Sequence, residues 1–259
     1  VAQYMRTQDP RAFARGLDGV LLERITRDSA KANNVDVPPA ILARATTARV
    51  QDWRRQLIQA AQVEKRQVDP DVWLQQVAGL APAEFRAFMR RHAEVELLQN
   101  RLLRYEEITQ PTVSVSIMVV HEKEEAHGVV QRLDNGEAFD KQAKAHSVHA
   151  TAPEGGKIEF PLLREDFNDA EVRTALFGAE PGAVLGPYPV SGGGKTFYHV
   201  YRLDSRRGGR LVAYTEVEEE IAQGLEARPA AVGEYERWRR RVLMRHRFRA
   251  APPPTAPPR

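Results

Sequence analysis

The chain has 259 residues, which is long enough to bury a hydrophobic core without help from disulfides or metal ions. Its formal net charge at pH 7 is only +3, so no strong overall field is expected to steer it to nucleic acid or to a membrane surface. The absence of cysteine excludes disulfide bonds, thiolate chemistry and thiol metal sites.

The sequence contains no apolar run long enough to span a bilayer. It begins at Val1 rather than at a methionine, so we expect a mature form from which a signal peptide or lipid anchor could have been removed. Membrane attachment is expected only through such an upstream segment. The lack of cysteine is compatible with an oxidising compartment but does not require one.

Apolar residues recur at helical spacing through residues 1–111, and prolines punctuate the pattern. Proline is tolerated in the first turn of a helix, where its missing N–H has no intrahelical partner in any case. Residues 106–111 are expected to form a linker. The helices are predicted to begin at Pro10, at Pro39, at Pro70 and at Pro82, the last of them running to about Tyr105.

Two features of this helical part have alternative interpretations. His92 lies near an apolar stripe, where it is either a ligand or a boundary histidine with one partner; no second histidine or acid stands at metal-ligand spacing, which favours the boundary histidine. Aromatic residues that serve either as core or as a peptide-binding cradle are Trp53, Trp73, Phe85 and Phe88.

Residues 112–206 have a different pattern. The alternating apolar run 113–120 and the β-branched and aromatic run 195–203 predict strands. The prolines within 186–190 restrict that segment to a short or edge strand, because proline cannot donate to a ladder. Helices are predicted over 122–134, 137–146 and 169–177, with a loop over 147–161.

Helical periodicity returns after residue 206 and is expected to extend to residue 249. Thr215 and Glu218 are expected to form a capping box at a helix start, and Pro229 to break that helix near Arg228. These apolar stripes have no partner except the N-terminal helices, so we expect the two parts to pack as one domain that is discontinuous in sequence. Residues 250–259 are rich in proline and predict a disordered or polyproline tail, either a spacer or a docking peptide.

The end of the chain is also rich in arginine. These side chains form either a patch for nucleic acid or lipid headgroups, or the solvated face of a helix. The solvated face is favoured, because no aromatic residues are interleaved as in a platform for single-stranded nucleic acid. The arginines are Arg237, Arg239, Arg240, Arg241, Arg245, Arg247 and Arg249.

The order and spacing of the motifs within residues 112–206 resemble the parvulin family of peptidyl-prolyl isomerases. The flanking helical parts resemble the chaperone domain of SurA/PrsA/PpiD-type foldases, which surrounds a parvulin module in the same way. The phrases that carry the resemblance are Val115-Ser116-Ile117-Met118-Val119, Asn135-Gly136-Glu137-Ala138-Phe139, Ala143-Lys144-Ala145-His146-Ser147, Gly155-Gly156-Lys157-Ile158, Ala175-Leu176-Phe177, Gly186-Pro187-Tyr188-Pro189-Val190 and Tyr198-His199-Val200.

The resemblance implies an α+β fold in which an all-helical chaperone domain, residues 1–111 and 207–249, receives an inserted parvulin-like module, residues 112–206, with an antiparallel sheet and helices. It implies a peptidyl-prolyl isomerase and chaperone that assists exported proteins in the periplasm or cell envelope. The expected partners are unfolded or proline-containing polypeptides, with a homodimer possible and with no nucleic acid. Prolyl isomerisation lowers the barrier of amide rotation by binding the twisted amide, so no metal and no cofactor is expected.

The resemblance also implies site residues. The family has facing histidines on its first and last strands: the last-strand position is His199, and Ser116 stands in place of the first. His149 falls at the loop position where the family has an acid or a cysteine, and Val172 at the position of a phenylalanine. The predicted catalytic residues are His199, Thr196, Ser116 and His149, and the predicted substrate-binding residues are Phe167, Val172, Phe177 and Met118.

These departures from the family pattern support an alternative. A serine at position 116 can form a hydrogen bond but cannot hold His199 as an imidazole would. The side chain of Val172 presents a smaller apolar surface to a proline ring than phenylalanine would. His199 is then a structural histidine satisfied by Ser116 or Thr196, and the protein is a non-catalytic holdase chaperone with a degenerate parvulin module.

Overall fold

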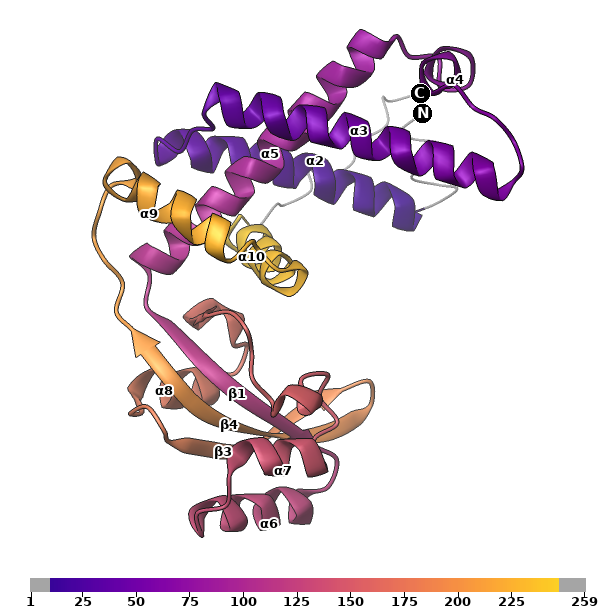
Figure 1. Ribbon diagram of the computed structural model, residues 1–259. Coiled ribbons are helices and arrows are strands. Elements are labelled where there is room, and N and C mark those ends of the chain that lie inside the picture. The colour runs from indigo at the N-terminus through magenta and orange to yellow at the C-terminus, as the bar shows by residue number, and fades with distance from the viewer. Residues whose placement is uncertain (1–9, 247–259) are drawn as a thin grey trace, which may run out of the picture. The chain divides into compact units, whose positions relative to one another are not determined.

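The computed structural model describes residues 10–246, and for residues 10–15 the backbone alone (Figure 1). The chain divides into two compact units. One, the helical unit, combines the residues up to Tyr105 with those from Ala213 onward; the other, the sheet unit, is Glu106–Val212. Across the described residues, no helix is both long enough and apolar enough to cross a membrane.

In the helical unit, the helix starts predicted at Pro39, Pro70 and Pro82 are confirmed. The last of the N-terminal helices runs four residues beyond Tyr105, so the prediction that residues 106–111 are a linker is wrong for most of that segment. The N–H of Arg210 donates to the carbonyl of Ile108 (2.9 Å), which gives the extended helix end a partner. The helices are α2 (Pro10–Ala32), α3 (Pro39–Val63), α4 (Pro70–Gln76), α5 (Pro82–Thr109), α9 (Tyr214–Ala227) and α10 (Val232–Arg245).

The start of α9 differs from the predicted capping box. Thr215 lies inside the first turn, and the helix begins one residue earlier, at Tyr214. The carboxylate of Glu216 accepts the N–H of Ala213 (2.9 Å), and Tyr214 is buried edge-on against Tyr105 (5.7 Å between ring centroids). The first residue of the helix is therefore buried, and the preceding N–H is capped by Glu216. The predicted break near Pro229 is confirmed, because α9 ends at Ala227.

A buried ion pair joins α5 to α10. The guanidinium of Arg104 contacts both carboxylate oxygens of Glu234, and the side chains are only 5% and 4% exposed. Arg228 reaches the same carboxylate (2.8 Å), and the N–H of Ala231 donates to it (3.0 Å). Glu234 thus accepts hydrogen bonds from three residues of the helical unit, and removing it would leave the guanidinium of Arg104 buried without this carboxylate.

The arginine-rich end is not a continuous exposed basic face over the described residues. Arg239 of α10 pairs with Asp18 of α2 (3.2 Å), and Arg241 is buried. Arg247, Arg249 and the proline-rich segment 250–259 lie outside the described residues.

The sheet unit contains a four-stranded antiparallel sheet in the order β2-β1-β4-β3, so the predicted α+β class is confirmed. The first and last strands pair along their length, from Thr112 opposite Arg207 to Val120 opposite Tyr198. The proline-containing strand lies at the edge, as predicted. The elements are β1 (Thr112–Val120), α6 (Lys123–Asp134), α7 (Phe139–His146), β2 (Leu162–Leu163), α8 (Ala170–Gly178), β3 (Val184–Gly192) and β4 (Lys195–Arg207).

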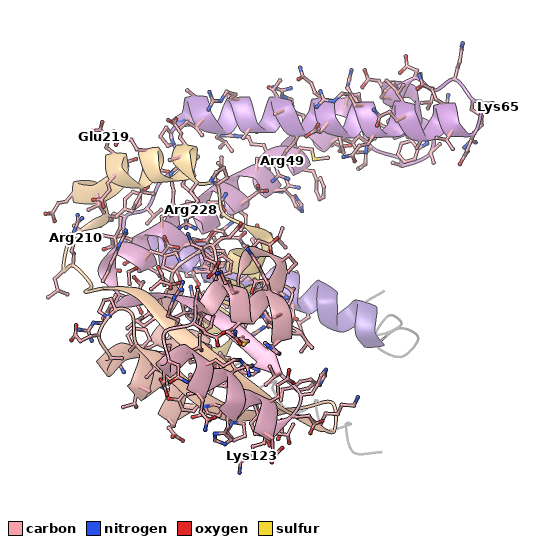
Figure 2. The ribbon with its side chains drawn as sticks, turned by 60° about the horizontal axis from the view of Figure 1, so that its bottom comes forward. Arg49, Lys65, Lys123, Arg210, Glu219 and Arg228 are labelled. Atoms are coloured by element: carbon pink, nitrogen blue, oxygen red, sulfur yellow. The ribbon has the colours of Figure 1, made fainter. Side chains whose placement is uncertain are left out.

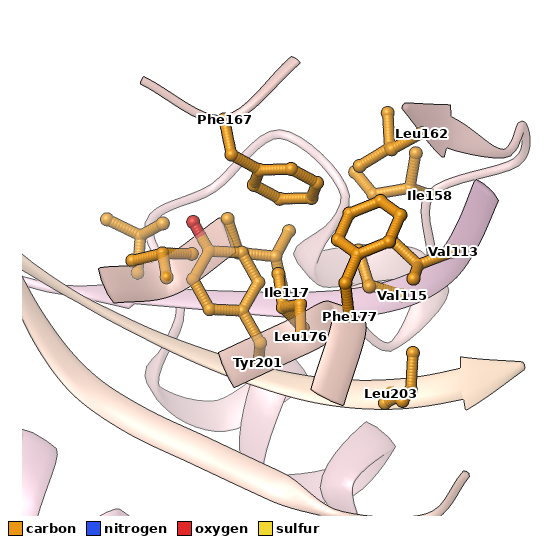
Figure 3. Packing of buried hydrophobic residues seen from close by; sticks show 12 residues of the cluster. Val113, Val115, Ile117, Ile158, Leu162, Phe167, Leu176, Phe177, Tyr201 and Leu203 are labelled. Carbon is orange, nitrogen blue, oxygen red and sulfur yellow. The ribbon is translucent and has the colours of Figure 1, made fainter. Parts of the chain in front are cut away.

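Both faces of this sheet are covered, which is why β1 is apolar on both sides. Met118 and Val120 face α6 and α7, in one cluster with Val200. Side chains of the other face pack against α8 and the loop before it (Figure 3). The buried strand residues of that second cluster are Val113, Val115, Ile117, Val119, Leu162, Tyr201 and Leu203. The alternation of β1 therefore divides its apolar side chains between two hydrophobic clusters, one on each face of the sheet.

Charged side chains cover the outer faces of the helices. Glu219 on α9 and Lys123 at the start of α6 are both exposed (Figure 2). Lys65, just after α3, takes a left-handed backbone conformation with φ of 55°. Its N–H still donates to the carbonyl of Gln62 (3.0 Å), so this helix end retains a backbone partner.

We expect Glu234→Ala to destabilise the helical unit by about 3–5 kcal/mol, because Arg104 would stay buried without its carboxylate. Glu236→Ala, two residues further along α10, is the matched control; its carboxylate is 54% exposed, and the expected loss is less than about 1 kcal/mol. The measurement is urea unfolding followed by tryptophan fluorescence, since all three tryptophans lie in the helical unit. Equal losses in the two variants would contradict the importance of the buried pair.

Candidate functional site

His199 lies half-buried in β4, between two strands. Val119 of β1 is its partner on one side and Tyr188 of β3 on the other. Gly186 lies against the backbone of His199: its φ is +114°, and a Cβ there would come within 2.6 Å of the His199 carbonyl oxygen. The close approach of β3 to this histidine therefore depends on a glycine.

The imidazole of His199 has a partner on its own strand. Its Nδ1 lies 3.1 Å from the hydroxyl oxygen of Tyr201, two residues further on and on the same face of the sheet. Tyr201 is 8% exposed, and its ring packs edge-on against Phe167 (6.3 Å) and at a tilt against Tyr188 (6.3 Å). The ring packing thus holds the hydroxyl in position.

The surroundings of His199 favour its neutral form. Burial lowers the pKa of His199, and the neighbouring His149 lowers that pKa further. A charged imidazole would lose hydration and would face a second group able to carry positive charge. At neutral pH His199 therefore presents one N–H donor and one acceptor nitrogen.

The loop that carries His149 is fastened to the strand position opposite His199. The N–H of Val148 donates to the carbonyl of Val119 (2.8 Å), and the hydroxyl of Ser147 accepts the N–H of Val119 (3.1 Å). The Nδ1 of His149 accepts the backbone N–H of Thr151 (3.3 Å) and lies 2.8 Å from its hydroxyl. These bonds bring His149 and His199 into one neighbourhood.

A glycine closes the same loop. The N–H of Ile117 donates to the carbonyl of Gly156 (2.7 Å), whose φ is +83°. A Cβ at this position would lie 2.3 Å from the Ile117 carbonyl oxygen, nearer than any side chain tolerates. Gly156 is therefore required for the packing of the loop against β1 as well as for a turn.

The predicted apolar residues on this side do lie together. Phe167 packs edge-on against Phe177 (6.3 Å), and both join Val172 in the cluster beneath Tyr201 (Figure 3). They are also deeply buried: Phe167 is 8%, Val172 3% and Phe177 7% exposed. These side chains, together with the buried ring of Tyr201, fill the space under the site with protein atoms, and the partly buried ring of Tyr188 packs against the cluster.

The structure corrects the prediction for Ser116. It stands opposite Arg202, three positions from the pairing of His199, and strand alternation turns its side chain to the other face of the sheet. There its hydroxyl donates to Asp204 (2.8 Å) and accepts from Arg202 (3.1 Å). Ser116 is therefore a buried structural residue. It does not face His199 and does not form a hydrogen bond with it.

The predictions for Met118 and Thr196 are corrected for the same reason. Met118 is fully buried against α6 and α7, on the face opposite to His199. Thr196 is exposed near the tip of the β3–β4 hairpin, where it pairs with Ser191, and it also alternates to the other face. Of the eight predicted site residues, the structure brings His199, His149, Phe167, Val172 and Phe177 to one side of the sheet.

Tyr188 and Tyr201 are site residues that the sequence reasoning missed. The signal for Tyr201 was present, because a residue two positions from His199 on a strand must share its face. Tyr188 required the register between β3 and β4. Burial raises the pKa of Tyr188, and the carboxylates of Glu171 and Asp169 raise that pKa further, so its phenol stays protonated.

The other predicted candidates lie in the helical unit. His92 is exposed, and its Nδ1 lies 3.1 Å from the carbonyl of Phe88 on its own helix, as a boundary histidine with one partner would. Trp53 packs on Phe85 (4.5 Å) and on Trp73 (6.1 Å). Nowhere in residues 10–246 do three or more histidine, aspartate or glutamate side chains gather as a metal site requires.

Comparison with known proteins identifies the class of the sheet unit. Residues 102–219 match the family model described as the PPIC-type PPIASE domain, so this segment is a parvulin-type domain. A search of curated proteins found no match to the chain.

Several solved structures are similar to this chain. Peptidylprolyl isomerase PrsA from Bacillus anthracis is 17% identical, with 91% of this chain and 99% of that one covered and a TM-score of 0.39. PrsA from Bacillus subtilis is 18% identical, with 97% and 89% covered and a TM-score of 0.35. A SurA-like chaperone from Campylobacter jejuni is 17% identical, with 77% and 81% covered and a TM-score of 0.34.

We expect the sheet unit to lose stability as pH falls below about 6.5, the ordinary pKa of histidine, because the pKa of His199 is lowered in the folded state. Over that pH range the unfolded chain binds more protons than the folded chain does, so acid favours unfolding. His199→Gln should weaken this dependence, and His127→Gln, at an exposed position on α6, should leave it in place.

The measurement is urea unfolding at about pH 7.5 and about pH 5.5, followed by the NMR amide signals of β4. An unchanged pH dependence in His199→Gln would show that another group is responsible.

Proposed function

We propose that this protein is a foldase: a peptidyl-prolyl cis–trans isomerase that also acts as a chaperone for unfolded, proline-containing polypeptides. The observation that carries the proposal is the half-buried imidazole of His199 within a parvulin-type domain, fixed by Tyr201 and bordered by His149 and by aromatic rings.

The proposed chemistry needs only binding. Rotation about a peptide bond has a barrier of about 18–20 kcal/mol because resonance is lost on the way. A site lowers that barrier when it binds the twisted amide more tightly than either planar form. A neutral imidazole supplies a hydrogen-bond donor beside the rotating group, and the half-buried ring of Tyr188 supplies an apolar surface for proline.

The helical unit is proposed to hold the unfolded client. Its return segment, from Ala213, packs on α2 and α5, so that the parvulin-type domain is bracketed in sequence by one compact unit. This bracketing is the feature that resembles SurA/PrsA/PpiD-type foldases. On that resemblance we propose that the protein works outside the cytoplasm, in the periplasm or cell envelope, on exported proteins.

A protease-coupled assay on a proline-containing peptide tests the isomerase. We expect the protein to accelerate cis–trans isomerisation, and His199→Ala to lower kcat/KM by about tenfold or more, in the range of a group that contacts the reacting bond. His127→Ala is the matched control and should keep full activity. No acceleration by protein with a native far-UV circular dichroism spectrum would contradict the isomerase.

One observation favours a second candidate, a holdase without catalysis. The apolar side chains expected to cradle the proline ring, Phe167, Val172 and Phe177, are almost completely buried and already filled in by their neighbours. The site then offers little depth to a substrate ring. The sheet unit would act in this case as a rigid body that presents client-binding surfaces.

Suppression of aggregation tests the holdase, and the isomerase assay on the same protein separates it from the foldase. A holdase should keep a thermally unfolded client soluble to the same extent in wild type, His199→Ala and His127→Ala, as measured by light scattering. Loss of suppression in His199→Ala alone would reject the holdase and would link chaperone action to the histidine.

A further inference from the structure

We propose that Tyr201 is a positioning residue for His199: its hydroxyl donates to Nδ1 and thereby holds the imidazole proton on Nε2, which faces away from the tyrosine. The catalytic consequence rests on the proposed isomerase function, whereas the tautomer itself does not. The resembling family places a histidine of the first strand beside the last-strand histidine, and in this chain a tyrosine of the same strand provides the partner.

The position of the hydroxyl follows from packing. Tyr201 and His199 are two residues apart on β4, so their side chains share a face. The Tyr201 ring is confined by Phe167 and by Tyr188, and it belongs to the hydrophobic cluster of that face (Figure 3). The oxygen lies 3.1 Å from Nδ1, within hydrogen-bond distance. A ring buried this well can move its oxygen very little.

The direction of the bond follows from the chemistry of the two groups. A neutral imidazole has one donor nitrogen and one acceptor nitrogen. A phenol is a much stronger acid than an imidazole N–H, so the favourable arrangement is O–H donating to the basic nitrogen. His199 lies in surroundings that disfavour its charged form. The protonated imidazole, in which both ring nitrogens are N–H donors, is therefore not the favoured form. Nδ1 is therefore the acceptor.

Strand register explains why a tyrosine has this role here. The residue of β1 opposite His199 is Val119, which cannot form a side-chain hydrogen bond. Ser116 is turned to the other face, where it bonds Asp204 and Arg202. The partner of Nδ1 is instead Tyr201, within the same strand.

The same tautomer is indicated for the second imidazole of the site. The Nδ1 of His149 accepts the backbone N–H of Thr151 (3.3 Å), and a backbone N–H can only donate. A neutral His149 therefore also has its proton on Nε2. The site then contains two imidazoles with the same tautomer, fixed by a tyrosine hydroxyl in one case and by a loop amide in the other.

The experiment compares Tyr201→Phe with Tyr188→Phe in the full chain. Both remove only a hydroxyl from a ring of the same cluster, and only the first removes the partner of His199. Long-range proton–nitrogen NMR spectra at neutral pH distinguish the two ring nitrogens of each histidine; the His199 signals are assigned by their loss in His199→Ala. In wild type and in Tyr188→Phe we expect the Nε2–H form, and in Tyr201→Phe a mixture of both tautomers.

Activity gives a second readout. We expect Tyr201→Phe to lower kcat/KM about threefold to tenfold, the size of one hydrogen bond, and to have no further effect in a His199→Ala background. A merely structural tyrosine would lower activity equally in both backgrounds.

Two results would overturn the positioning role: an Nδ1–H tautomer in wild type, or unchanged tautomer signals in Tyr201→Phe. If wild type proves inactive while the tautomer responds to Tyr201→Phe, the isomerase proposal fails and the positioning of His199 by Tyr201 stands.

Discussion

The pairing of β1 with β4 is the interaction on which the sheet unit depends. These strands are separated in the chain by residues 121–194, and they are the two inner strands of the sheet. β1 is covered on both faces. Met118 and Val120 pack against α6 and α7, and the side chains on the other face that pack in the cluster with α8 are Val113, Val115, Ile117 and Val119. A shift of one residue in this register would turn each side chain of one strand to the opposite face of the sheet, relative to the other strand.

The same pairing determines what the site contains. His199 and Tyr201 share the α8 face, and the loop bearing His149 is bonded to Val119, directly opposite His199. Ser116 and Met118, only a few residues away in sequence, are turned to the opposite face. The candidate site therefore combines side chains from β4, β3 and a loop. β1 was expected to supply a catalytic side chain, but it contributes backbone groups that position the loop.

Most of the elements could be predicted from local patterns. Prolines marked the starts of α3, α4 and α5, Pro229 marked a break, and the alternation of residues 113–120 marked a strand. The errors arose where a tertiary contact extended or shifted an element. The carbonyl of Ile108 gains a partner in Arg210, so α5 continues, and α9 begins at the buried Tyr214 rather than at Thr215.

By itself the sequence determined the α+β class, the two strands and the helical flanks, because composition, period and spacing are local properties. The two imidazoles of the candidate site, His199 and His149, were predicted from the resemblance to the parvulin family. Only the tertiary structure decided which face each strand residue occupies relative to its neighbours. That depends on strand register, which is set by long-range hydrogen bonds and by the packing of two clusters. For this reason Tyr201, rather than Ser116, is the hydrogen-bond partner of His199.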